Sequence, residues 1–342
     1  MVLHLVVAFF ALHLAVQPPG LDPDDRVRLA EAFHLADSVQ DSVWPGWRGV
    51  PFAVLLVTEG HEFLLRHPRP SDDFALVADY DSLLGSAVYV RERQYDPSLL
   101  ATFPAVGGLP TVVVGQPSAT GRASTEWVLT VLHEHFHQFQ FSQPGYYEDT
   151  AALDLAGGDE SGMWMLNYPF PYASDTVGAH MAVYRDALVD ALDHLDVDAH
   201  LSTYRKARAQ WRAVLSDADY RYFSFQLWAE GVARYIELRV ATAAAERHDP
   251  LPEFLALSDA ISYAEAARSA RRRLAQELAA LDLASWGRVA FYPLGAAEAL
   301  LLDAAQPGWQ RRYTDEPFYL ERYLDSGELE VQQTGPGSQQ PE

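Results

Sequence analysis

The sequence predicts a mixed α+β fold, with a small mixed sheet in the N-terminal part and a mainly helical C-terminal part. Two β-branched runs bounded by glycine and proline, SAVYVRER at 86–93 and TVVVG at 111–115, are typical of strands. From about residue 124 onward, one stretch after another has apolar residues at helical spacing. The 342 residues, 49% of them hydrophobic, are enough to bury a sizeable core, and no internal repeat divides them.

The first elements follow from local patterns. Amphipathic spacing predicts a helix over residues 22–43, which the Trp-Pro-Gly-Trp stretch after it ends. Residues 51–65 then indicate a strand, a turn and a further short element. PAVGGLP at 104–110 indicates a loop between the two strands named above.

The later elements are mainly helices. After a loop at 115–125, Ser124 or Thr125 is a suitable cap for a helix that runs to the Gln-Pro-Gly stop at 143–145. Residues 146–176 are rich in loop-forming residues. The helices expected beyond them are two over 177–215 with a turn near 195–198, and one each over 220–246, 258–281 and 287–305.

The N-terminus carries a short apolar run. Residues 2–16 are nearly all apolar, and a Pro-Pro-Gly break follows them, so the run is too short to span a bilayer comfortably. Its length predicts a signal peptide over 1–17 and a secreted or periplasmic protein, with a buried first strand or an uncleaved anchor as alternatives. We expect one domain over 22–325, and a disordered tail over 326–342.

Charge and cysteine content exclude several functions. The net charge is −22, with 47 acidic and 25 basic residues, so the surface should repel nucleic acid and anionic membranes. We therefore expect no nucleic-acid partner, and no stable membrane span. The chain has no cysteine, which excludes disulfides, thiolate metal sites and cysteine nucleophiles. Nothing in the sequence indicates an oligomeric state.

The stretch HEHFH at 133–137 is the main functional signal. His133 and His137 are four residues apart, so both imidazoles lie on one helix face and can reach one ion, while Glu134 lies beside them. Two imidazoles of this kind hold zinc in HExxH hydrolases, and the carboxylate takes a proton from water. His135 points elsewhere and is expected to have a structural role. The alternative is a histidine-rich helix face that pairs with nearby carboxylates.

A catalytic zinc needs a third protein ligand from elsewhere in the chain. Glu230, in LWAEGVARYIEL, is our candidate, although it could simply pair with Arg234 one turn away. Gly231 costs about 1 kcal/mol in a helix interior, which indicates close packing at this point, and a ligand helix packed on the 133–137 helix would explain it. Asp159 and Glu160 are rival carboxylates in a loop-like stretch.

HEHFH followed by WAEGVARYIE resembles the gluzincin metallopeptidases, the clan of thermolysin and the zinc aminopeptidases. FYPLG at 291–295 is similar to the Y-x-x-G helix start of the aminopeptidases. The resemblance covers about residues 105–305 and implies a zincin-like fold around the active-site helix. Two departures stand out: a helical insertion at about 177–215 must separate the histidines from Glu230, and the G-x-M-E-N element that binds a free amino terminus is missing.

The resemblance implies a zinc metallopeptidase. One Zn²⁺ per chain would be held by His133, His137 and Glu230, with Glu134 as general base and Tyr292 as a donor to the oxyanion. TVVVG is expected to be an edge strand on which a peptide or protein substrate pairs, with an ordinary internal strand as the alternative. Alternative functions are an inactive zincin-like binding module, and a metal-free exported binding protein.

One further carboxylate lies near this set in the sequence. Glu237 is two turns from Glu230 on nearly the same helix face. We expect it to pair with Arg234 or Arg239, and the alternative is that it orients a ligand histidine.

Overall fold

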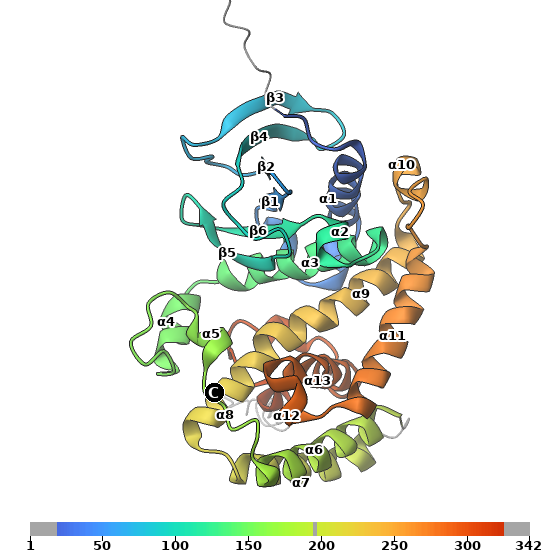
Figure 1. Ribbon diagram of the computed structural model, residues 1–342. Helices are drawn as coiled ribbons and strands as arrows, with labels where there is room; N and C mark the ends of the chain where they lie inside the picture. The colour runs from blue at the N-terminus through green and yellow to red at the C-terminus, as the bar shows by residue number, and fades with distance from the viewer. Residues whose placement is uncertain (1–18, 194–196, 325–342) are drawn as a thin grey trace, which may run out of the picture.

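A computed structural model of the chain describes residues 19–193 and 197–324. It contains a six-stranded mixed sheet in the N-terminal part and helices in the rest, as predicted (Figure 1). The predicted signal peptide at 1–17 and tail at 326–342 lie outside the described residues, as do residues 195 and 196 of the predicted turn near 195–198. No helix in the described ranges is long and apolar enough to cross a membrane.

The sheet has the order β3-β4-β2-β1-β6-β5, and only the pair of β1 and β6 is parallel. Alternate residues face opposite sides. The side chains of Leu56 and Val114 join the large core against the helices, and those of Leu55 and Val113 join a smaller cluster on the other face. The strands are β1 (Val54–Val57), β2 (His61–Leu65), β3 (Ala75–Asp81), β4 (Ser86–Glu92), β5 (Leu100–Val106) and β6 (Leu109–Gly115).

The edge of the sheet differs from our expectation. TVVVG lies in β6, which pairs with both β1 and β5, so it is an internal strand and the prediction of an edge strand was wrong. The stretch PAVGGLP is not simply a loop, because it contains the end of β5, a tight turn and the start of β6. Gly107 and Gly108 both have positive φ and form that turn, which only glycine adopts without strain. β5 is therefore the edge strand on this side of the sheet, and β3 is the edge strand on the other side.

Two helices cover the large-core face of the sheet. Asp22 is the N-cap of helix α1 (Pro23–Val43), and its side chain accepts from the first free backbone N–H groups. Helix α3 (Ser124–Phe141) directly follows β6, after the short α2 (Pro117–Thr120). Ser124 is the first helical residue and not the cap, since Asp259 accepts its backbone N–H at 3.0 Å and its hydroxyl at 2.6 Å.

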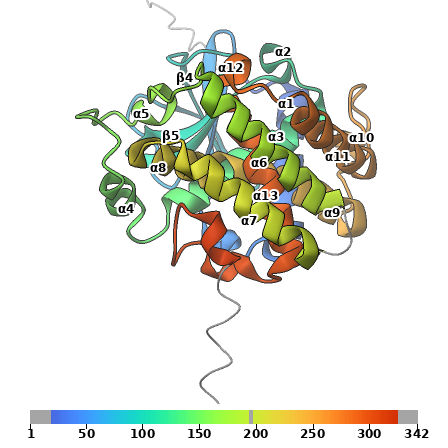
Figure 2. The same ribbon diagram turned by 90° about the horizontal axis from the view of Figure 1, so that it is seen from below.

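The C-terminal part is a set of packed helices (Figures 1 and 2). Those near the sheet are short: α4 (Tyr146–Ala152) and α5 (Trp164–Asn167). The remaining elements are α6 (Asp175–Asp193), α7 (Val197–Ala213), α8 (Asp217–Gln226), η2 (Leu227–Gly231), α9 (Val232–Arg247), α10 (Pro252–Leu255), α11 (Tyr263–Ala280), α12 (Leu283–Trp286), η3 (Gly287–Ala290), α13 (Phe291–Ala305), η4 (Trp309–Arg312) and η5 (Leu320–Tyr323), with η1 (Trp47–Gly49) after α1.

The predicted insertion at 177–215 is the α6–α7 pair, which packs against α13 (Figure 2). A buried polar network joins them. Glu298 of α13 accepts hydrogen bonds from Tyr184 of α6 and from Tyr204 and Arg208 of α7. A buried carboxylate needs such partners, so the network fixes how the pair sits on α13.

Candidate metal centre

Helix α3 carries the HExxH residues into the interior. From Ser124 to Gln140 every residue except Glu126 is buried, because the sheet covers one side of the helix and α1 and α9 cover others. His133 and His137 are 6% and 7% exposed. Buried imidazoles need polar partners, and the two rings find them toward α9.

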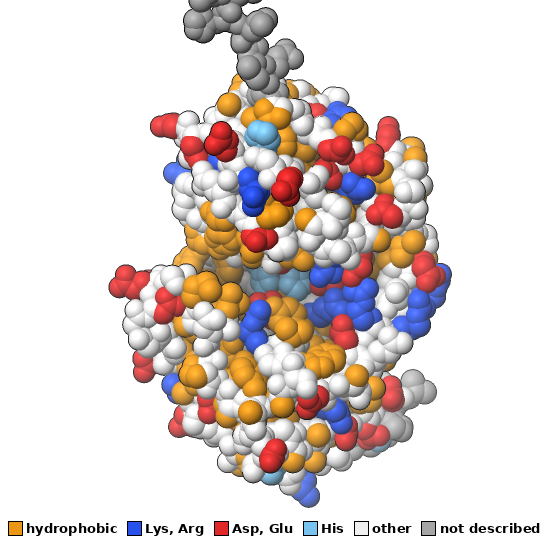
Figure 3. Space-filling model, in the orientation of Figure 1, with side chains coloured by type: hydrophobic (Ala, Val, Ile, Leu, Met, Phe, Trp, Pro, Cys, Tyr) orange, Lys and Arg blue, Asp and Glu red, His pale blue; other side chains and the backbone are white. Residues whose placement is uncertain are grey.

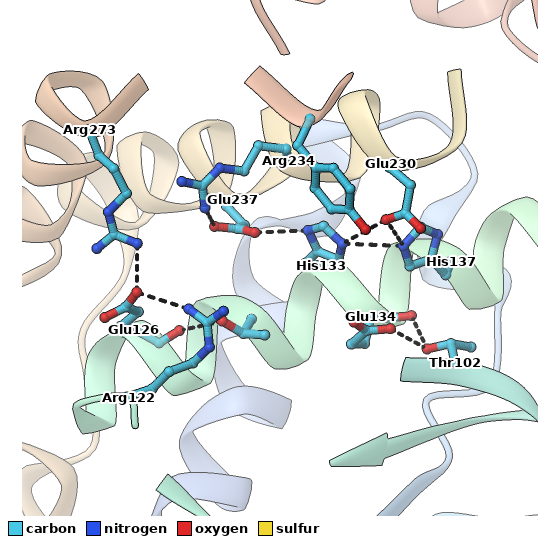
Figure 4. A network of polar contacts seen from close by, with 12 residues as sticks. Thr102, Arg122, Glu126, His133, Glu134, His137, Glu230, Arg234, Glu237 and Arg273 are labelled. Atoms are coloured by element: carbon cyan, nitrogen blue, oxygen red, sulfur yellow. Dashed lines mark hydrogen bonds and ion pairs between the residues drawn. The ribbon is translucent and has the colours of Figure 1, made fainter. Parts of the chain in front are cut away.

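Glu230 meets both histidines. It lies in η2, a π-helical turn between α8 and α9, so the three segments form one long helix with an irregular turn at the candidate ligand. Such turns are frequent at functional sites. The Glu230 Oε2 atom is 3.5 Å from His137 Nε2 and 3.8 Å from His133 Nε2, and the two nitrogens are 3.2 Å apart (Figure 4).

The Nδ1 atoms of His133 and His137 are each hydrogen-bonded to a side-chain oxygen. His133 Nδ1 is 2.8 Å from Glu237 Oε1, and His137 Nδ1 is 2.6 Å from Gln140 Oε1. The orientation of the Gln140 amide is set by its nitrogen, which donates to the carbonyl oxygen of Ala229. Because carboxylate and carbonyl oxygens only accept, both Nδ1 atoms carry a proton, and both Nε2 atoms are directed toward Glu230.

Glu237 has both of the roles considered from the sequence. One of its oxygens accepts from His133, and the other accepts from Arg234. Burial raises the pKa of Glu237, but Arg234, His133 and Arg122 together lower it to about 2. The carboxylate therefore stays ionised and can orient the His133 ring.

Without a metal, the charges of this centre are balanced by protons. Burial lowers the pKa of His133, but its interactions with Glu230 and Glu237 overcome this and raise the pKa to about 10. Burial also raises the pKa of Glu230, yet its hydrogen bonds with the two histidines bring it well below its ordinary value. A proton is thus held where a cation would otherwise lie.

The donor atoms fit a tetrahedral zinc ion. Ligand atoms 2.0–2.1 Å from such an ion lie about 3.4 Å from one another. The three separations given above, from 3.2 to 3.8 Å, are close to that value. His133, His137 and Glu230 also form the group of possible metal ligands found among the described residues, with ligand atoms within 4.8 Å of one another. Two imidazoles and one carboxylate are a common donor set for catalytic zinc.

Arg288 is a site residue that the sequence did not reveal. Its Nη1 atom donates to Glu230 Oε1 at 3.1 Å and to the hydroxyl of Tyr292 at 2.9 Å. It thereby binds the Glu230 oxygen that faces away from the histidines. Its position one helical turn before Tyr292 was the available signal, but arginine on a helix surface is too common to be informative.

Tyr292 lies beside the centre. Its ring is nearly parallel to that of His133, with centroids 6.4 Å apart. Burial, and then the charge of Glu230, raise the pKa of Tyr292 well above its ordinary value. The hydroxyl therefore keeps its proton and remains a hydrogen-bond donor.

Gly231 has a different neighbour from the one expected. A Cβ atom on Gly231 would lie 2.4 Å from the Cα atom of Gly295, so the close approach is to α13 and not to α3. The two helices cross with their backbones in contact at this glycine pair. This contact brings the start of α13, and with it Tyr292, next to Glu230.

Glu134 is turned about 100° around α3 from His133, and its side chain points toward the edge strand β5 (Figure 4). The Oγ1 atom of Thr102, in β5, is 2.9 Å from Glu134 Oε2 and 2.8 Å from the backbone oxygen of the same residue. Because β5 was not predicted, this contact was missed as well. It joins the edge of the sheet to the carboxylate expected to act as base.

The remaining candidates lie outside the centre. His135 is 1% exposed and stacks on Phe52 with ring centroids 3.8 Å apart, in line with the expected structural role. Burial lowers its pKa to about 3, so it stays neutral. Asp159 accepts from the backbone of Ser161 and Trp164 and thus closes its own loop, and neither it nor Glu160 is among the clustered ligands.

The centre lies in a hollow of the surface. Figure 3 shows a groove between the part that holds the sheet and the helical part, with histidine side chains at its floor. Figure 4 shows His133, His137 and Glu230 directed toward one another from α3 and η2. Comparison with family models, curated proteins and solved structures finds no match for this chain. Its function is therefore inferred from the chemistry of the side chains.

Proposed function

We propose that the chain is a zinc-dependent peptidase with a zincin-like active site. The observation that carries the proposal is the convergence of two Nε2 atoms and one carboxylate oxygen from His133, His137 and Glu230, with both Nδ1 atoms hydrogen-bonded to other residues. A zinc ion held there would acidify water and polarise a carbonyl oxygen.

The other residues supply proton transfer and charge stabilisation. Glu134 follows the first histidine on α3 and would accept the proton of the attacking water, then pass it to the leaving amine. The Thr102 hydroxyl restrains this carboxylate. Tyr292 keeps its proton and would donate a hydrogen bond to the oxyanion, while Arg288 holds Tyr292 and Glu230 in place.

The groove and the edge strand favour an extended peptide as substrate. β5 borders the groove beside α3, and as an edge strand it has backbone groups free to pair with another strand (Figure 1). Such pairing aligns a peptide bond without regard to its side chains. Specificity must then come from the side chains on both sides of the centre.

Metal content is the first test. Atomic absorption on purified protein should give about one zinc per chain for the wild type and much less for Glu230→Ala. Glu134→Gln should keep the metal and abolish cleavage of a peptide library followed by mass spectrometry. A folded wild type that neither contains nor takes up zinc would disprove the proposal. Full zinc in Glu230→Ala would disprove the ligand set.

A further inference from the structure

Three arginines gather on one side of the metal centre. Arg122, Arg234 and Arg273 lie toward the N-terminal end of α3, beyond His133 (Figure 4). Figure 3 shows basic side chains directly beside the histidines in the groove. The chain carries a net charge of −22, so such a gathering at the groove runs against its overall charge.

Two of these arginines share a single carboxylate oxygen. Arg122 Nη1 and Arg273 Nη1 donate to Glu126 Oε1 at 2.9 and 2.6 Å. Their side chains are 27% and 38% exposed, and the buried Arg122 Nε has no hydrogen-bond partner within the described part of the chain. Each guanidinium has five N–H donors, so the pair can bind a second carboxylate.

The position of the arginine pair along α3 follows from Glu126, the residue that both arginines contact. Glu126 and His133 are seven residues apart on α3, which is two turns along the same face and about 10 Å. An extended peptide advances about 3.3 Å per residue. A carboxylate bound by the pair would thus belong to a residue about three positions from the scissile bond.

The opposite side of the centre is apolar. α4 and α5 lie beyond the C-terminal end of α3 (Figure 1). Tyr147 of α4, Met163 just before α5 and Leu166 of α5 are 57%, 48% and 49% exposed. The ring of Phe141, at the end of α3, is 6.1 Å from that of His137. The groove therefore has a basic end and an apolar end. A peptide bound in it is expected to carry an acidic group at the basic end and apolar residues at the other.

On the premise of the proposed peptidase function, we infer that Arg122 and Arg273 form a binding subsite for a substrate carboxylate. The substrates are peptides with an acidic group about three residues from the cleaved bond and apolar residues on its other side. The carboxylate comes either from an aspartate or glutamate side chain or from the C-terminus of the peptide, and both present the same planar oxygen pair to the guanidinium groups.

Peptide binding tests the subsite separately from cleavage. The probes are fluorescein-labelled octapeptides with one leucine and one glutamate moved through the sequence, each with a glutamine twin, and with free or amidated C-termini. Anisotropy is measured on zinc-loaded Glu134→Gln protein. At the best position glutamate should bind roughly tenfold more tightly than glutamine. A preference that persists in amidated peptides identifies a side chain, and one seen only with free termini identifies the C-terminus.

The preference should disappear in Arg122→Gln/Arg273→Gln and weaken in Arg273→Gln alone, a change at a partly exposed side chain. Arg272→Gln is the matched control, since it removes the same charge from a side chain that is 58% exposed and pairs with Glu265. A preference that survives the double change overturns the subsite, and so does equal binding of acidic and neutral peptides by the parent protein. Preference without hydrolysis by wild type would disprove the peptidase and support the subsite.

Discussion

Gly231 and Gly295 face each other where the helix of Glu230 crosses that of Tyr292. Each would place an added Cβ atom within 3.0 Å of the other's backbone, so neither position has room for a side chain. The contact sets the spacing between a candidate zinc ligand and the candidate oxyanion donor. Glycine at these positions thus serves the site through packing, although it touches none of the reacting groups.

Enlarging either glycine should destabilise the protein. Gly295→Ala should lower the free energy of unfolding by about 1–3 kcal/mol, because backbone atoms of Leu227 and Gly231 cannot yield as a flexible side chain would. Gly178→Ala in α6 is the control: nothing lies within 4 Å, so alanine should stabilise by up to about 1 kcal/mol. Urea denaturation measures both, and equal effects would contradict the close crossing.

The hydrogen bond behind His133 should influence zinc affinity. Glu237→Ala removes the acceptor for Nδ1 and should weaken zinc binding roughly 10–100-fold. Glu237→Gln keeps an acceptor oxygen and should weaken zinc binding less than Glu237→Ala does. Glu277→Gln is the control, because Glu277 pairs with Arg234 without touching His133. Competition with a chromogenic chelator gives the affinities, and equal losses in all three variants would argue against this role.

Zinc binding should release a proton at neutral pH. In the metal-free protein the carboxylates raise the pKa of His133 from 6.5 to about 10, so the ring is protonated between these values and a metal must displace that proton. Zinc affinity should therefore rise with pH over this range, by up to about tenfold per unit. Calorimetry in buffers of different ionisation enthalpy counts the protons, and a count of zero would refute the raised pKa.

The raised pKa of His133 also predicts how the stability of the metal-free protein changes with pH. A pKa raised on folding means that protonated His133 stabilises the fold fully below about pH 6.5, and that this contribution is lost as the pH rises through about 10. Thermal unfolding of the metal-free wild type should show the loss on the alkaline side. His133→Gln should remove this part of the pH dependence.

Thr102 should matter for turnover through the position of Glu134. Thr102→Val removes the hydroxyl but keeps the shape, so we expect kcat to fall roughly tenfold, while zinc content stays unchanged because Thr102 is not one of the clustered ligands. Thr102→Ser restores the donor and should recover most of the rate. If valine and serine behave alike, the contact does not position the base.

The centre was more predictable than its surroundings, for a physical reason. His133 and His137 are close in sequence, and helical periodicity alone places them on one face. Glu230 was found through its local setting. Arg288 and Thr102 reach the site only through tertiary packing of η3 and β5, which no local pattern specifies.

Prediction of the sheet from the sequence was limited in the same way, because its edge strands lack a local pattern. β1, β4 and β6 have β-branched sequences whose residues are mostly buried or half-buried, and they were predicted, whereas β3 and β5 were not. β3 is largely exposed, and β5 contains Pro104, a residue that sheets accept at an edge, where a backbone N–H need not be paired. Edge strands lack the apolar pattern by which internal strands are recognised, so the position of the edge was misassigned.

The π-helical turn at Leu227–Gly231 lets one continuous helix both pack its apolar residues and direct Glu230 toward the histidines. Its extra residue changes the helical phase, so α8 and α9 can each keep their apolar residues inward while Glu230 faces the histidines. Deleting one residue from this turn would restore ordinary winding and rotate everything on one side by about 100°. We therefore expect related chains to keep the number of residues in this turn, even where their sequences differ.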